Sequence, residues 1–131
     1  MYSETEIAEL RQLIRDAKLS VPERFDAFSD WELAKICNGW GPDSWPHIFR
    51  WLLTKTAGKY AVLALPHDVR FEFKVGTLEE ANKEFWKNAK RIWLFYYGWK
   101  GVFNLKAVNE LLVLLACYRV LQIASKSAWE D

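Results

Sequence analysis

One stretch of the chain carries residue types and spacings that could perform chemistry. The dipeptide His67-Asp68 is followed by an aromatic residue, a glycine and an Ala-Asn pair, at Phe71, Gly76, Ala81-Asn82 and then Phe85. A loop of sequence NGWGP, residues 38–42, lies upstream. A histidine can transfer protons, and a carboxylate can bind a cation. The dipeptide alone is common by chance, so the signal lies in the ordered set.

In this order the residues resemble a family of prophage-associated proteins similar to phospholipase A2. The family pattern has an NGCG-type loop, then a cysteine three residues before His-Asp, and an aromatic residue three positions after that aspartate. A Gly-Thr turn and an Ala-Asp helix start followed by phenylalanine complete it. The resemblance covers about residues 37–90, within a phospholipase A2-like segment of about 37–97.

The resemblance implies Ca²⁺-dependent hydrolysis of lipid acyl esters. In such enzymes a histidine activates water as a general base, and Ca²⁺ polarises the ester carbonyl. Carried over to this chain, His67 would be the base, Asn82 the residue that orients it, and Asp68 a calcium ligand. Calcium takes six to eight oxygen ligands. The resemblance assigns further ones to the backbone carbonyls of the loop, at Gly39, Trp40 and Gly41.

The chain departs from the family pattern at several of these positions. Asn82 replaces an aspartate, so it can accept a hydrogen bond from His67 but adds no charge to stabilise an imidazolium. The same replacement behind a catalytic histidine of a serine protease costs about 10⁴ in rate. Trp40 and Ala64 stand where the family has cysteines, and a large and a small side chain could fill the space of a disulfide. Phe71 lacks a tyrosine hydroxyl.

These departures favour a degenerate member of the family, namely a non-catalytic binding protein of phage or mobile-element origin. The alternative is a Ca²⁺-dependent acyl-ester hydrolase that uses His67 as its base. A structural interpretation also stays open for each residue. His67 can be a packed core histidine, Asp68 a helix cap or turn residue, and the 38–42 loop a turn without ligands.

Composition predicts one globular domain over residues 1–131, because the chain is 51% hydrophobic and 27% charged. Eighteen basic against seventeen acidic residues give a net charge of +1, which argues against a nucleic-acid-binding role. The chain has no apolar run of about 20 residues and no secretory signal, so we expect a cytoplasmic protein. Cys37 and Cys117 are expected to be buried free thiols rather than a disulfide.

Aromatic residues make up 16% of the chain, with eight Trp, eight Phe and five Tyr. Each ring can bury about 150–250 Å², so even this short chain can build a large core. Rings that do not fit into the core would face a protein partner, a second copy in a homodimer, or a membrane interface.

The sequence predicts a mainly α domain of about five to six helices. Helices are expected at about 4–18, around 31–37 with a stop at Asn38-Gly39, from Pro46 onward, at about 78–97 and at about 103–126. Capping boxes mark three of the starts, at Ser3 with Glu6, Ser29 with Glu32, and Thr77 with Glu80. Residues 111–118 (LLVLLACY) are apolar all round, which predicts a central buried element or an oligomer contact.

Residues 59–75 allow two interpretations. Two apolar runs flank Pro66-His67-Asp68, and the second alternates as a strand would, which would make a hairpin in an α+β fold. In a helix, Leu63 and His67 would share one face with Phe71 and Val75, and Pro66 would lie near the start or at a kink. The resemblance implies an antiparallel helix pair, so we predict the helix.

Overall fold

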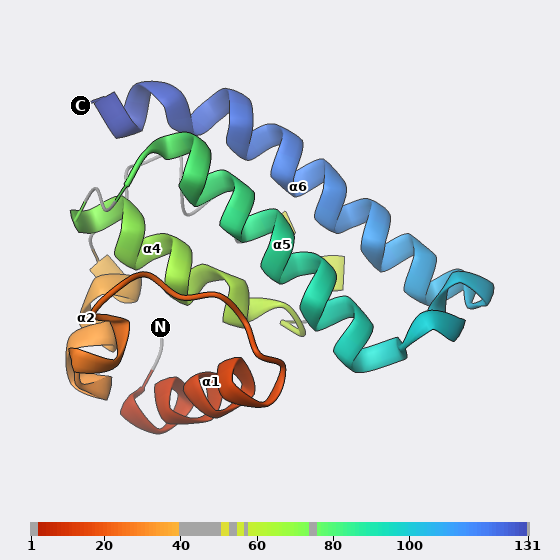
Figure 1. The fold of residues 1–131 in the computed structure, drawn as a ribbon, viewed down its shortest axis with the longest axis horizontal. Coiled ribbons are helices and arrows are strands. Elements are labelled where there is room, and N and C mark those ends of the chain that lie inside the picture. The colour runs from red at the N-terminus through yellow and green to blue at the C-terminus, as the bar shows by residue number, and fades with distance from the viewer. Residues whose placement is uncertain (1–2, 40–50, 53–54, 57, 74–75, 131) are drawn as a thin grey trace.

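The computed structural model describes residues 3–39, 51–52, 55–56, 58–73 and 76–130, and Figure 1 shows their arrangement. These residues form a mainly α domain without strands. Its helices are α1 (Glu4–Asp16), α2 (Asp30–Gly39), α4 (Ala64–Phe73), α5 (Leu78–Tyr97) and α6 (Leu105–Glu130). Three short 3₁₀ turns connect them, namely η1 (Phe25–Ala27), η2 (Ala61–Leu63) and η3 (Trp99–Phe103).

The segment that allowed two interpretations is helical. Residues 61–63 form η2 and lead directly into α4, so the hairpin alternative is wrong and the helix is confirmed. Pro66 is the third residue of α4. It is tolerated there because the first N–H groups of a helix have no intrahelical acceptor, so the missing proline N–H costs no helix hydrogen bond.

Local capping fixes the beginnings of three helices. The Ser3 hydroxyl accepts from the Glu6 amide while the Glu6 carboxylate accepts from the Ser3 amide, which completes the predicted capping box of α1. Ser29 and Glu32 make the same reciprocal pair before α2. At α5, Thr77 accepts from the Glu80 amide. Each such cap stabilises its helix by about 1 kcal/mol.

Helix α5 is the central element of the domain. It packs against α4 on one side and α6 on the other, and α2 bridges α1 and α4. Figure 1 shows that α4 and α5 run antiparallel, as do α5 and α6. Large side chains that the fold buries completely include Ile7, Leu33, Leu65, Phe85, Ile92 and Leu114. The core therefore receives residues from every described helix.

Helix α6 differs from the sequence-based expectation. It buries Leu114 and Cys117, but Leu112, two residues before Leu114, is 59% exposed. The stretch 111–118 therefore buries only one face of its helix, although its residues are apolar on all sides. The central buried element is α5 and not α6. Cys117 carries a free thiol, as predicted, and burial raises its pKa to about 12. The helix expected from Pro46 begins outside the described residues.

A polar network joins α4 and α5 to the segment after α1. Arg70 donates two hydrogen bonds to the Glu84 carboxylate, from Nε to Oε1 at 2.8 Å and from Nη2 to Oε2 at 2.9 Å. Ser20 Oγ also donates to Glu84, and the Ser20 backbone exchanges two hydrogen bonds with the Asn88 amide. Both charged side chains are largely buried, so their pairing matters for stability.

The turn at η3 is packed tightly against α5. A Cβ atom added to Gly101 would lie 2.7 Å from the Trp93 ring and 2.8 Å from Tyr97 Cβ. The Trp93 indole in turn donates a 2.7 Å hydrogen bond to the Ala107 carbonyl, at the start of α6. A glycine is therefore needed where the chain turns from α5 into α6.

Candidate functional site

The predicted base, His67, lies on α4 and faces α5. Its imidazole is 1% exposed and packs edge-to-face on the Phe85 ring, with centroids 5.9 Å apart and an interplanar angle of 80°. His67 therefore lies in the core, as does Leu63 one turn before it. A general base must reach a water molecule and a substrate. This side chain instead lies within the packed interface of two helices.

The environment of His67 favours its neutral form. Burial lowers its pKa to about 3, because the charged imidazolium would lose its hydration. The nearby Ala81 backbone acts in the opposite direction, and the Arg70 charge lowers the pKa further. The imidazole is thus held neutral at physiological pH, which a base requires, but it is a very weak base.

Asn82, the predicted orienting residue, lies on α5 opposite α4. It is buried, and its Oδ1 accepts no hydrogen bond from the residues that the structure describes. The hydrogen bond from His67 to this oxygen, which the resemblance implies, is therefore not formed. The two residues do lie on neighbouring antiparallel helices, as the resemblance implies, and His67 packs on Phe85, three positions after Asn82 on α5.

The predicted calcium ligands are only partly placed. Asp68 is half-buried on α4, next to His67, and Gly39 is the last residue of α2. Trp40 and Gly41 lie outside the described residues, so the loop cannot be compared with a calcium site. Within the described part of the chain, no group of three or more His, Cys, Asp or Glu side chains is arranged to hold a metal ion.

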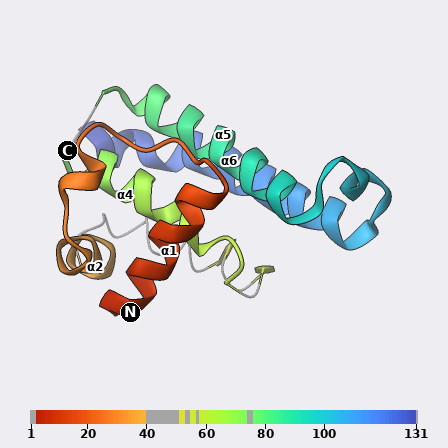
Figure 2. The same cartoon turned by 60° about the horizontal axis from the view of Figure 1, so that its bottom comes forward.

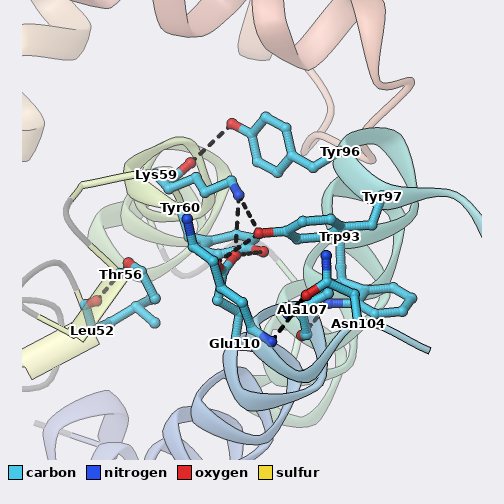
Figure 3. Close-up of polar contacts among 11 residues, drawn as sticks. Leu52, Thr56, Lys59, Tyr60, Trp93, Tyr96, Tyr97, Asn104, Ala107 and Glu110 are labelled. Carbon is cyan, nitrogen blue, oxygen red and sulfur yellow. Dashed lines mark hydrogen bonds and ion pairs between the residues drawn. The ribbon is translucent and has the colours of Figure 1, made fainter. Parts of the chain in front are cut away.

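A second polar cluster, which sequence reasoning missed, surrounds Glu110 on α6 (Figure 3). Tyr60 Oη and Tyr97 Oη each donate a 2.7 Å hydrogen bond to its carboxylate, and Lys59 Nζ lies 3.2 Å from Oε1. Lys59 also donates to Tyr97 Oη and lies over the Tyr96 and Tyr97 rings. The sequence signal for this cluster was Glu110 itself, a single acidic residue in an apolar helix. A buried carboxylate requires hydrogen-bond or charge partners.

The ionisation of this cluster follows from its hydrogen bonds. Burial raises the pKa of Glu110, but the donors from Tyr97, Tyr60 and Lys59 more than offset it, and the pKa is lowered overall. Burial, together with the Glu110 charge, raises the pKa of Tyr60 far above its usual range. Glu110 is therefore a carboxylate and Tyr60 a phenol at neutral pH. The Tyr60 hydroxyl and the Glu110 carboxylate satisfy each other's hydrogen-bonding capacity, which is typical of a structural connection rather than a reactive site.

We expect Glu110→Ala to destabilise the domain by about 3 kcal/mol, because it leaves the buried Tyr60 hydroxyl without its acceptor and the Lys59 ammonium without its counter-charge. Glu110→Gln keeps an acceptor and is expected to cost about half as much. Urea unfolding followed by circular dichroism measures both changes. Equal stability of wild type and Glu110→Ala would show that the cluster does not hold the helices together.

The fold and these side chains define the class of protein: a small, mainly α domain with a packed α4–α5 pair and exposed aromatic residues. The chain matches no protein-family model, and no curated protein or solved structure gives a significant match to it. None of its helices, within the described residues, is long and apolar enough to cross a bilayer.

Proposed function

We propose that this chain is a degenerate phospholipase A2-like protein that binds a partner and does not catalyse ester hydrolysis. The observation that carries the proposal is the burial of the His67 imidazole between α4 and α5. With its pKa near 3 and its edge on Phe85, this histidine is placed to fill a core position and not to activate water. Asn82 adds no charge that would raise its basicity.

The surface of the domain supports a binding role. Several large apolar side chains are exposed on the α5–α6 hairpin, including Phe95, Trp99, Phe103, Leu112 and Ile123. The exposed part of such side chains gains nothing from burial in the isolated chain, and contiguous exposed apolar surface is typical of an interaction site. A protein partner or a second copy could cover the outward face of α6, where Leu112, Val120 and Ile123 recur at helical spacing.

The alternative function, a Ca²⁺-dependent acyl-ester hydrolase, makes the opposite prediction for a simple assay. We expect wild-type protein and His67→Gln to release fatty acid from phospholipid vesicles at the same background rate, with and without Ca²⁺. The assay measures released fatty acid, and calorimetry of the same samples measures Ca²⁺ uptake. The reason is that the buried imidazole cannot touch a water molecule that attacks a lipid ester.

Asn82→Asp is an informative further variant, because it restores the carboxylate of the family pattern. Hydrolysis that appears only in Asn82→Asp would support a decayed site on a phospholipase A2-like scaffold. Ca²⁺-dependent hydrolysis by the wild type, lost in His67→Gln, would contradict the proposed function and establish the enzyme instead.

A further inference from the structure

Large apolar side chains at the tip of the α5–α6 hairpin are among the most exposed of the residues that the structure describes. Trp99 is 81% exposed, Phe103 90% and Leu105 86%, and Val102 between them is also exposed. We define the tip by these four residues. They lie within seven positions of one another, around η3. In both views the hairpin end projects beyond α1, α2 and α4 (Figures 1 and 2).

The charges of the chain are distributed unevenly around this tip. Residues 1–84 contain eleven basic and fourteen acidic side chains, whereas residues 85–129 contain seven basic and one acidic. That single acid is Glu110, which is buried and paired with Lys59. Lys100 and Lys106 lie within the tip region itself, and both are exposed. The near-zero net charge of the chain therefore conceals a stretch, residues 85–129, of net charge +6, and the whole α5–α6 hairpin (Leu78–Glu130) carries eight basic and five acidic side chains.

We infer that the tip inserts into the interfacial region of an anionic lipid bilayer. This inference rests on the proposed function, for which it names the partner. A tryptophan ring and neighbouring apolar side chains favour the boundary between headgroups and acyl chains, while lysines beside them are attracted by anionic headgroups. The tip combines all three on one projecting turn.

Shape and charge together favour a lipid surface over a protein partner. A projecting turn can enter a fluid interface without a complementary pocket, and no part of the other helices extends as far in this direction (Figure 2). The absence of acidic residues from 85 to 109 removes the repulsion that anionic lipids would exert on the hairpin. Since no described helix can span a bilayer, the contact is interfacial.

Vesicle flotation tests this inference directly. The probes are vesicles of phosphatidylcholine alone, and of phosphatidylcholine with about 30% phosphatidylserine, which provides an anionic surface. We expect the full chain to float with the anionic vesicles and to bind the neutral ones much more weakly. The triple variant Trp99→Ser, Phe103→Ser, Leu105→Ser is expected to bind about 100-fold more weakly, because it removes the apolar side chains that insert. These side chains are exposed, so the variant should fold normally.

A charge variant separates the two contributions. Replacing Lys100 and Lys106 by glutamine is expected to weaken binding to anionic vesicles about fivefold for each lysine, and to leave binding to neutral vesicles unchanged. Trp31→Ser is the matched control, because Trp31 is also exposed and also lies beside a lysine, Lys35, but on α2. We expect this control to bind like wild type.

Several outcomes would overturn the inference. The inference is wrong if the wild type floats with neither kind of vesicle, or if the triple variant binds vesicles as the wild type does. It is also wrong if Trp31→Ser loses as much vesicle binding as the triple variant. A wild-type dimer that the triple variant dissociates, without vesicle binding, would instead identify the tip as a protein contact. Fatty acid released in the same tubes would contradict the proposed function whatever the vesicles bind, so the two failures are distinguishable.

Discussion

Arg70→Met is expected to destabilise the domain by about 3–5 kcal/mol, because it leaves the Glu84 carboxylate buried without a counter-charge. Both oxygens of that carboxylate accept hydrogen bonds from the Arg70 guanidinium in the wild type. The Ser20 hydroxyl would still donate its 2.8 Å hydrogen bond to this carboxylate, but it carries no charge. In a domain of this size the loss corresponds to a fall in Tm of about 10–20 °C, which thermal unfolding followed by circular dichroism can measure.

The matched control lies one residue before Glu84 on the same helix. Lys83 pairs with Glu79 at 3.0 Å, but both side chains are mostly exposed. Lys83→Met is therefore expected to leave Tm unchanged, because exposed pairs contribute little. The double variant Arg70→Met, Glu84→Leu should recover much of the stability, since no buried charge then remains. A small effect of Arg70→Met alone would show that Glu84 reaches water when its partner is removed.

The second large effect is a pH dependence of stability that His67 causes. The pKa of its imidazole is about 3 in the folded chain, because of burial, and about 6.5 when unfolded. Between these values the unfolded state binds a proton that the folded state does not bind. Stability therefore falls as pH decreases below about 6.5, by up to about 1.4 kcal/mol per pH unit.

Urea unfolding from pH 7.5 down to about 5 measures this slope above the range in which most carboxylates titrate. The chain has one other histidine, His47, so the experiment compares His47→Gln with the double variant His47→Gln, His67→Leu. We expect stability to fall with decreasing pH in His47→Gln, and this dependence to be absent in the double variant. A slope that persists without His67 would mean that another group causes it, and that the imidazole is less buried than its packing on Phe85 indicates.

The features that the sequence predicted well are those that local chemistry determines. Ser3 and Ser29 cap their helices through residues three positions away, and the bounds of α5 follow from Thr77 and Gly98 at its two ends. The position of Pro66 in the first turn of α4 depends on only a few neighbours. Such interactions are encoded within one helical turn, so spacing alone identifies them.

Long-range contacts could not be predicted in the same way. Glu110 accepts a hydrogen bond from Tyr60, fifty positions away, and no local pattern predicts that pairing. No local pattern predicts that Phe103 is exposed while Phe85 is buried, since exposure depends on where the helices pack. The spacing of His67 with Leu63 did indicate a shared helix face, but its neighbours on α5 come from the tertiary fold. The residues 40–41, which the calcium prediction needs, lie outside the described part of the chain.

The fit of Gly101 against Trp93 and Tyr97 has a consequence for how the hairpin meets any partner. Because the indole of Trp93 also holds the Ala107 carbonyl, the backbone of this turn is fixed to both helices before contact occurs. The backbone that carries the outward side chains is therefore preorganised, so binding costs little backbone entropy. The remaining cost is the rotamer entropy of the side chains, about 0.5–1.5 kcal/mol for each one that binding immobilises. The absence of a side chain at Gly101 thus permits the tight packing that lowers the backbone entropy lost on binding.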